Sequence, residues 1–148
     1  MNLQTKYHGE IDIQQEDIIT FPNGIPAFEE ENKFILLPLQ SELPFSILQS
    51  VNTPDLAFVI GEVFSLFPEY DIELTQNAIE ALELKESKDA VLYSIITVKE
   101  PFIKSTANLQ GPIIINCVKK VGKQVVLNQT SYHTKHELAG TPAFAQGD

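Results

Sequence analysis

Residues 105–116 read STANLQGPIIIN, a polar, amide-rich loop that leads directly into a short apolar run. Gly111 and Pro112 favour a turn, and the amides of Asn108 and Gln110 each offer a hydrogen-bond donor and an acceptor. The three isoleucines at 113–115 anchor the loop to a predicted core strand. The pattern favours a recognition loop over a catalytic one; the alternative is a loop that only connects two strands.

Short apolar runs of this kind recur along the chain, and turn-forming residues separate them. Ile11 and Ile13 alternate, and longer runs follow at residues 33–39, 45–51, 57–63, 90–98, 112–118 and 124–127. Turn signals lie between them, for example at 120–123. Roughly seven to nine strands at this spacing predict a mostly β, single-domain, antiparallel β-barrel-like or sandwich fold.

One segment departs from the strand pattern and predicts a short α-helix. Thr75 is suited to cap its N-terminus, and the apolar residues among 78–82 fall on one face with glutamates pointing outward. A helical turn at 14–17, followed by a strand at 18–21, is a further expectation.

The length of 148 residues fits one domain, which we expect to span residues 1–138 and to be followed by a flexible tail at 139–148. The single cysteine, Cys117, cannot form an internal disulfide, and we expect it to be buried in a strand, as suits a reducing cytoplasm. No signal peptide and no apolar run long enough to cross a bilayer are found, so the sequence predicts a cytoplasmic protein.

The formal net charge of -10, from 20 acidic and 10 basic residues, repels phosphate backbones and anionic lipids. We therefore expect no direct binding to nucleic acid or to membranes. Many soluble proteins are acidic simply to stay in solution, so charge alone does not identify a basic partner. The same charge opposes self-association, and we expect a monomer.

Patterns typical of catalysis or of cofactor binding are not found. The sequence has no Gly-x-Ser-x-Gly elbow, and its glycines are scattered singly, which does not suit phosphate binding. His133 and His136 have a spacing that would bring two imidazoles together on a helix, but Lys135 lies between them and no cysteine follows. We expect no enzyme activity, no cofactor and no metal.

Two carboxylates, Asp71 and Glu73, alternate along a predicted strand edge and leave an acid/base hydrolase open as an alternative. The absence of tryptophan counts against a sugar-binding platform. The plain interpretation of these acids, and of the glutamates at 29–31, is a solvated face. The sharper one is an electrostatic patch for a partner rich in lysine and arginine.

Six sequence blocks, in this order, resemble the family of the bacterial flagellar assembly factor FliW over about residues 1–138. They are QTKYHG (4–9), FPNGIPAFE (21–29), PFSILQS (44–50), PDLAF (54–58), TANLQGPI (106–113) and GKQV (122–125). Ala27 departs from the family, whose turn often has glycine there. If that position requires a positive φ, alanine costs about 1 kcal/mol. The residues after Leu138 match nothing in the family.

The resemblance implies a cytoplasmic, non-enzymatic regulator with a compact antiparallel barrel-like fold and two alternative protein partners. One partner resembles the RNA-binding translational repressor CsrA, and the other is flagellin. Flagellin held in the cytoplasm would occupy the protein, and its secretion would free the protein to capture the repressor and relieve repression of flagellin translation.

Polar loop residues and acids beside the matched blocks are the expected partner contacts. They are Asn52, Thr53, Asp55, Glu69, Asp71, Glu73, Asn108 and Gln110. A function of another class stays open, a small-ligand-binding β-barrel lined by Phe45, Phe58 and Phe102. An empty interior would favour the ligand, and an interior filled with side chains would favour a protein-binding module.

Overall fold

The computed structural model describes residues 2–39, 44–127 and 130–139, and of the expected tail only Ala139 lies within them. The strands are β1 (Asn2–Gln4), β2 (Glu10–Asp12), β3 (Ile19–Thr20), β4 (Lys33–Pro38), β5 (Phe45–Ser50), β6 (Ala57–Glu62), β7 (Ala90–Thr97), β8 (Thr106–Ala107), β9 (Ile113–Asn116), β10 (Val121–Gln124) and β11 (His136–Glu137). The α-helices are α1 (Val63–Leu66) and α2 (Gln76–Ala81), and the 3-10 helices are η1 (Gln15–Asp17), η2 (Ser87–Asp89) and η3 (Phe102–Lys104). No helix within the described ranges is long and apolar enough to cross a membrane.

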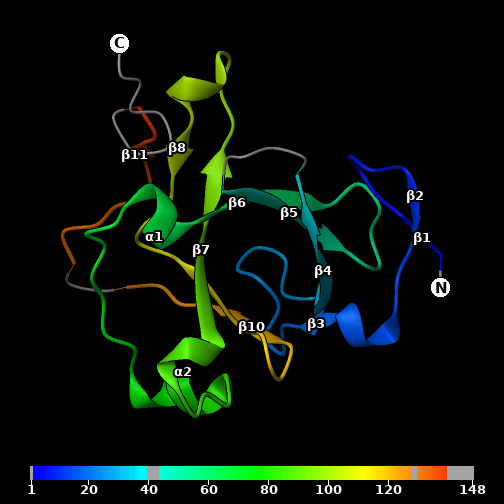
Figure 1. Cartoon of the computed structure of the whole chain (residues 1–148), viewed down its shortest axis with the longest axis horizontal. Coiled ribbons are helices and arrows are strands. Elements are labelled where there is room, and N and C mark those ends of the chain that lie inside the picture. The colour runs from blue at the N-terminus through cyan, green and yellow to red at the C-terminus, as the bar shows by residue number, and fades with distance from the viewer. Residues whose placement is uncertain (1, 40–43, 128–129, 140–148) are drawn as a thin grey trace.

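Seven strands close into a barrel, which confirms the expected mostly β class (Figure 1). They pair in the order β7-β6-β5-β4-β3-β10-β9, and β9 pairs in turn with β7 to complete the ring. All these pairs are antiparallel except β3 with β10, which pair in parallel through Thr20 and Val121. Strands β1 and β2 form a separate two-stranded sheet, and β8 and β11 extend the sheet beyond the far end of β7. Closure leaves the barrel wall without the free edges that an open sheet would present.

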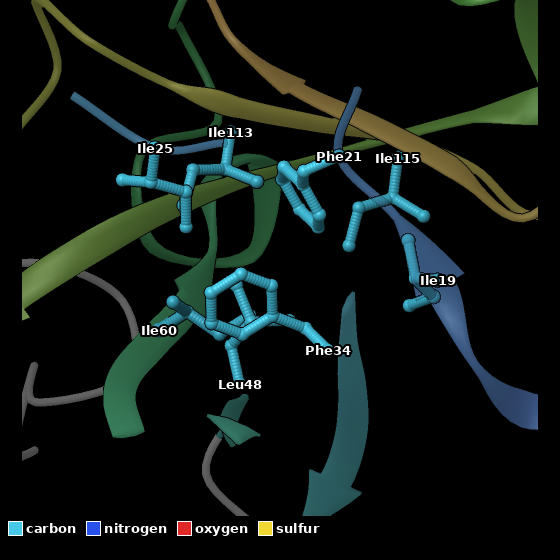
Figure 2. Close-up of a cluster of buried hydrophobic side chains, with 8 residues drawn as sticks. All are labelled: Ile19, Phe21, Ile25, Phe34, Leu48, Ile60, Ile113 and Ile115. Carbon is cyan, nitrogen blue, oxygen red and sulfur yellow. The ribbon is translucent and has the colours of Figure 1, made fainter. Parts of the chain in front are cut away.

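The barrel interior is filled by aromatic and branched apolar side chains. Figure 2 shows this cluster, whose members are Ile19, Phe21, Ile25, Phe34, Leu48, Ile60, Ile113 and Ile115. The rings of Phe21 and Phe34 pack edge to face with their centroids 5.3 Å apart, in the geometry that aromatic pairs prefer.

The three phenylalanines expected to line a ligand cavity are packed against other side chains. Phe58 packs against the core cluster, and Phe45 and Phe102 pack against each other in a second cluster with centroids 5.3 Å apart. A filled interior is the arrangement that favours a protein-binding module over a ligand-binding barrel.

Helix α2 forms where the sequence predicted it, because its start is encoded locally. The Thr75 hydroxyl accepts a hydrogen bond from the Ala78 N–H (3.1 Å), as an N-cap residue does. Ala78 and Leu82 are buried, and the neighbouring glutamates are exposed. Helix α1, directly after β6, adds a second short α-helix that the sequence analysis did not expect. The expected turn at 14–17 is confirmed as η1, with β3 after it.

The turn between β9 and β10 begins three residues earlier than expected. The Asn116 side-chain oxygen accepts hydrogen bonds from the backbone N–H groups of Val118 (3.0 Å) and Lys119 (3.1 Å). Lys120 adopts a positive φ of 56°. These features fold residues 117–120 into the turn. Cys117 is therefore exposed in the turn, and the prediction that it is buried in a strand is wrong.

Strand β10 consequently begins at Val121, and the prediction of a strand over 124–127 is wrong. Gly122, which looked like a turn residue, lies within this strand. A Cβ atom at Gly122 would come within 2.5 Å of the Phe21 ring in the barrel core. The glycine is needed there because a large core side chain approaches the backbone closely, and not because the chain turns.

Candidate partner-binding site

The eight expected contact residues fall into two regions of the molecule. The loop between β5 and β6 holds three of them, and the segment between α1 and α2 and the loop between β8 and β9 hold the other five. In Figure 1 the first loop lies on the side of β1 and β2, away from the α1–α2 segment. The structure therefore separates Asn52, Thr53 and Asp55 from the rest. A hydrogen bond from Tyr70 to Leu109 joins the segment that carries Glu69, Asp71 and Glu73 to the loop that carries Asn108 and Gln110.

The three acids between α1 and α2 are exposed, and the residues between them face inward. Tyr70 is buried and Ile72 is half-buried, so acidic and apolar side chains alternate along this stretch. The segment forms no strand, and the expected strand edge at Asp71 and Glu73 is wrong. The inward side chains, Tyr70 and Ile72, pack in an apolar cluster with Leu92 of β7. The segment therefore lies against the outer face of the barrel without being hydrogen-bonded into the sheet.

Two tyrosines hold this acidic segment in place. The Tyr70 hydroxyl donates a hydrogen bond to the carbonyl oxygen of Leu109 (2.7 Å), and the Asp71 N–H donates one to the Tyr132 hydroxyl (2.9 Å). The two rings pack with centroids 4.5 Å apart. Burial, and to a lesser extent Tyr132, raises the pKa of Tyr70, which therefore stays protonated as a donor. The backbone that carries the acids is thus tied to the loop at 108–110.

The amides of Asn108 and Gln110 form hydrogen bonds within the protein. The Asn108 side-chain oxygen accepts hydrogen bonds from the N–H groups of Gln110 (3.1 Å) and Gly111 (2.9 Å), and Gln110 Nε2 donates one to the Leu127 carbonyl (3.3 Å). Both side chains are half-buried. These contacts set the shape of the loop, which supports the connecting role that the sequence left as the alternative to recognition.

The loop at 52–55 is organised around a carboxylate that the sequence analysis assigned to a solvated face. Glu31 accepts hydrogen bonds from the Ser50 hydroxyl (2.6 Å) and the Thr53 hydroxyl (2.7 Å). These two hydrogen bonds lower the pKa of Glu31, and burial opposes them only in part. Asn52 and Asp55 remain exposed, so they are the side chains of this loop that a partner can reach.

A buried glutamine, Gln49, joins the same loop to the N-terminal segment. Its Nε2 donates hydrogen bonds to the carbonyls of Ser50 (3.0 Å), Pro54 (3.0 Å) and Leu56 (3.2 Å), and its Oε1 accepts one from the Lys6 N–H (2.9 Å). Sequence reasoning missed this residue because it lies at the end of an apolar run. A glutamine within an apolar strand indicates such a structural role, because a buried amide must form hydrogen bonds inside the protein.

The side chains of His133 and His136, near the C-terminal end of the described chain, pack against each other. Their rings are stacked with centroids 3.8 Å apart, and His136 Nε2 accepts a hydrogen bond from the His133 N–H (2.9 Å). Burial, together with the neighbouring His133, lowers the pKa of His136. Among the described residues, no three or more His, Cys, Asp or Glu side chains gather as metal ligands would.

Comparison with known proteins identifies relatives along nearly the whole chain. The family model described as FliW protein matches residues 2–138. A protein of Geobacillus sp. (strain WCH70) named flagellar assembly factor FliW is 56% identical over 138 residues, which cover 93% of this chain and 95% of that protein. A Bacillus subtilis (strain 168) protein of the same name is 45% identical over 140 residues, covering 95% of this chain and 98% of that protein.

A solved structure supports the same relationship. The crystal structure of a flagellar assembly factor FliW superposes with a TM-score of 0.90 at 53% sequence identity, and it covers 93% of this chain and 96% of that one. Sequence blocks, closed barrel and relatives agree, and this chain belongs to the FliW family.

Proposed function

We propose that this protein is a cytoplasmic, non-enzymatic flagellar assembly factor that binds the translational repressor CsrA and, alternatively, flagellin. Binding of CsrA would relieve repression of flagellin translation. Flagellin would compete for the protein until it is secreted. The observation that carries the proposal is membership of a family whose relatives, 45% and 56% identical over nearly their full length, are named flagellar assembly factors.

The charge distribution supports a basic protein partner. Residues 69–89 contain seven acidic and two basic side chains, so this short segment carries half of the net charge of -10. Glu69, Asp71 and Glu73 are exposed on a backbone that Tyr70 and Tyr132 hold in place. Fixed charges of one sign speed association with a partner of opposite sign, and they repel nucleic acid.

A protein-binding role also fits the filled interior of the barrel. The small-ligand alternative needs an enclosed apolar cavity, but the core cluster occupies that space. The acid/base alternative needs carboxylates held in a cleft, whereas Asp71 and Glu73 are both exposed.

The test is calorimetric titration of the protein with purified CsrA, alone and after preloading with flagellin, at low and moderate salt. We expect binding that weakens as salt rises, because the Debye length falls below about 10 Å above 0.1 M. We expect preloading with flagellin to abolish it. No binding at any salt concentration would reject the anti-repressor role, and simultaneous binding of both partners would reject the competition.

A charge-matched pair of variants separates local from overall electrostatics. We expect Asp71→Lys with Glu73→Lys to weaken CsrA binding and to reduce its salt dependence. The control, Glu16→Lys with Glu30→Lys, changes the net charge equally at exposed positions elsewhere. Equal effects of the two pairs would show that only the overall charge matters, and that the acids at 71 and 73 are not contacts.

A further inference from the structure

The tight turn FPNG at 21–24 carries a reactive pair that the proposed function does not use. Asn23 is the only asparagine of the chain that glycine follows. Glycine has no side chain to hinder attack of its backbone nitrogen on the carbonyl carbon of the asparagine side chain. The attack closes a cyclic succinimide and releases ammonia, and water then opens the ring to an aspartyl or an isoaspartyl residue. The pair is therefore a site at which the chain can modify itself.

The asparagine side chain is accessible to water, but the attacking nitrogen is held in the turn. Asn23 is exposed, whereas Gly24 is buried and its N–H donates a hydrogen bond to the Phe21 carbonyl (2.8 Å). Gly24 has a φ of 66°, and a Cβ atom there would lie 2.5 Å from the Glu29 carbonyl oxygen. The Gly24 nitrogen must lose its proton and this hydrogen bond, and move toward the Asn23 side chain, before it can react. The folded turn therefore opposes the first step.

The residues on both sides of the turn are anchored in the barrel core. Phe21 and Ile25 are 0% and 1% exposed, and both belong to the core cluster (Figure 2). The Phe21 N–H also donates a hydrogen bond to the Asn32 carbonyl (2.8 Å), and its ring lies directly against Gly122 of β10. Rotation of the backbone at 23–24 has to displace at least one of these buried side chains. The cost of that displacement is of the same kind as the cost of unfolding the core.

We propose that Asn23 is a deamidation site that reacts only while the barrel core around Phe21 and Ile25 is open. Water is the co-reactant: ammonia leaves, water adds, and the neutral amide becomes a carboxylate. The product carries one negative charge more than the net -10 of the original chain. The open state is transient and its population follows the stability of the fold, so the rate of deamidation follows that stability as well.

The two products differ in how they fit the native turn. An isoaspartyl residue lengthens the main chain by a CH2 group, between two residues whose side chains the core holds in place. An aspartyl residue leaves the main chain unchanged, and Lys123 lines the same cavity of about 200 Å³ as Asn23, so a carboxylate there meets a positive charge. A chain that opens is therefore converted in part to an isoaspartyl form that refolds to a less stable barrel.

The test measures the rate of deamidation of the full chain over a series of urea concentrations. Peptide mapping separates the asparaginyl, aspartyl and isoaspartyl forms of the peptide that contains Asn23. We expect the folded chain to react at least about a hundredfold more slowly than the chain unfolded in urea, because few molecules are open at any moment. Below the unfolding transition, the logarithm of the rate should rise linearly with urea, with the slope that the equilibrium m-value gives.

Two outcomes of this series would overturn the proposal. One is a folded chain that reacts as fast as the unfolded chain, and the other is a slow rate that does not depend on urea. Asn52 is an internal control, because it is exposed but is followed by Thr53, whose branched side chain hinders the attack. We expect Asn52 to react much more slowly than Asn23 in the unfolded chain. Equal rates would show that the glycine is not decisive and would reject the site.

A remote variant separates opening of the core from a local movement of the turn. Tyr70→Phe removes a hydrogen bond to Leu109, and Tyr70 belongs to a different apolar cluster from Phe21. We expect this variant to speed deamidation of Asn23 by the factor by which it lowers the folding equilibrium constant, about five- to thirtyfold. The control Val98→Ser alters a residue that is 52% exposed, and it should change neither the urea midpoint nor the rate. A lowered midpoint with an unchanged rate in Tyr70→Phe would show that the turn moves by itself, and would overturn the proposal.

The isolated products complete the test. We expect the isoaspartyl chain to unfold at a lower urea concentration than the unmodified chain. The matched control is Asn23→Asp, which carries the same added charge on an unchanged main chain, and its midpoint should stay close to that of the unmodified chain. Equal midpoints for the isoaspartyl chain and Asn23→Asp would reject the claim that the turn excludes the longer main chain.

Discussion

Replacing Ala27 by glycine is expected to make the protein more stable. Residues 25–28 form a tight turn in which the Phe28 N–H donates a hydrogen bond to the Ile25 carbonyl (2.6 Å). Pro26 takes the second position of this turn, and Ala27 takes the third with a φ of 76°. A proline followed by a positive φ is the pattern of a type II turn, whose third position favours glycine. Alanine at 27 is therefore strained.

The expected gain follows from two opposing terms. A residue with a Cβ atom costs about 1–2 kcal/mol in this left-handed region, and glycine removes that cost. Glycine also makes the unfolded chain more flexible, which costs about 0.4–1 kcal/mol. Ala27 is exposed, and its N–H can still donate to Glu29 (3.0 Å) after the change, so no packing is lost. At the midpoints of these two ranges, the net gain in the free energy of unfolding is about 0.8 kcal/mol.

Urea unfolding followed by circular dichroism measures this gain. With an m-value of about 2 kcal/mol per molar, the midpoint should rise by about 0.3–0.5 M with m unchanged. The control is Gly9→Ala, which introduces the same strain at a φ of 66° with no heavy atom within 4 Å of the new Cβ. We expect the control to lower the midpoint by a similar amount. If Ala27→Gly leaves the midpoint unchanged or lowers it, the turn is not strained at this residue and the reasoning is wrong.

Three further changes test other parts of the structure by the same unfolding assay. Gly122→Ala forces a methyl group against the Phe21 ring, and we expect a loss of about 1–3 kcal/mol; an unchanged midpoint would show that the core yields there. Tyr70→Phe leaves the Leu109 carbonyl without its donor, and we expect a loss of about 1–2 kcal/mol. Glu31 has a folded-state pKa below its usual 4.5, so its stabilisation is present above pH 4.5 and lost as pH falls through the lower folded value. Below pH 4.5 the midpoint of the natural protein should therefore fall more steeply than that of Glu31→Gln, and parallel curves would contradict this role.

Features encoded by neighbouring residues could be predicted from the sequence. The Thr75 cap and the apolar runs that became β4 to β7 depend on local propensity and periodicity, and both were expected. The register that joins β9 to β7 depends on contacts between distant residues, and periodicity does not specify it. The role of Gly122 could not be predicted from its neighbours either, because the Phe21 ring that leaves no room for a side chain there lies far away in the sequence.

In the candidate site, too, some features could be predicted from the sequence and others could not. The exposure of Glu69, Asp71 and Glu73 followed from their charge, and the structure confirms it. The internal hydrogen bonds of Asn108 could not be predicted, because a side-chain amide can bond either to a partner protein or to the backbone of its own loop. Glu31 looked like one of three equivalent glutamates, and only the folded chain brings it to the hydroxyls of the next loop.

The parallel pair between Thr20 and Val121 determines when this protein can finish folding. The barrel cannot close until β9 and β10 have been synthesised, because they lie between β7 and β3 in the ring. A chain that is still growing on the ribosome therefore presents one open edge on β3 and another on β7. Pairing across so long a separation is slow, and open edges can pair with other chains meanwhile. For this barrel, the interval before its last two strands appear is the period of greatest exposure to aggregation.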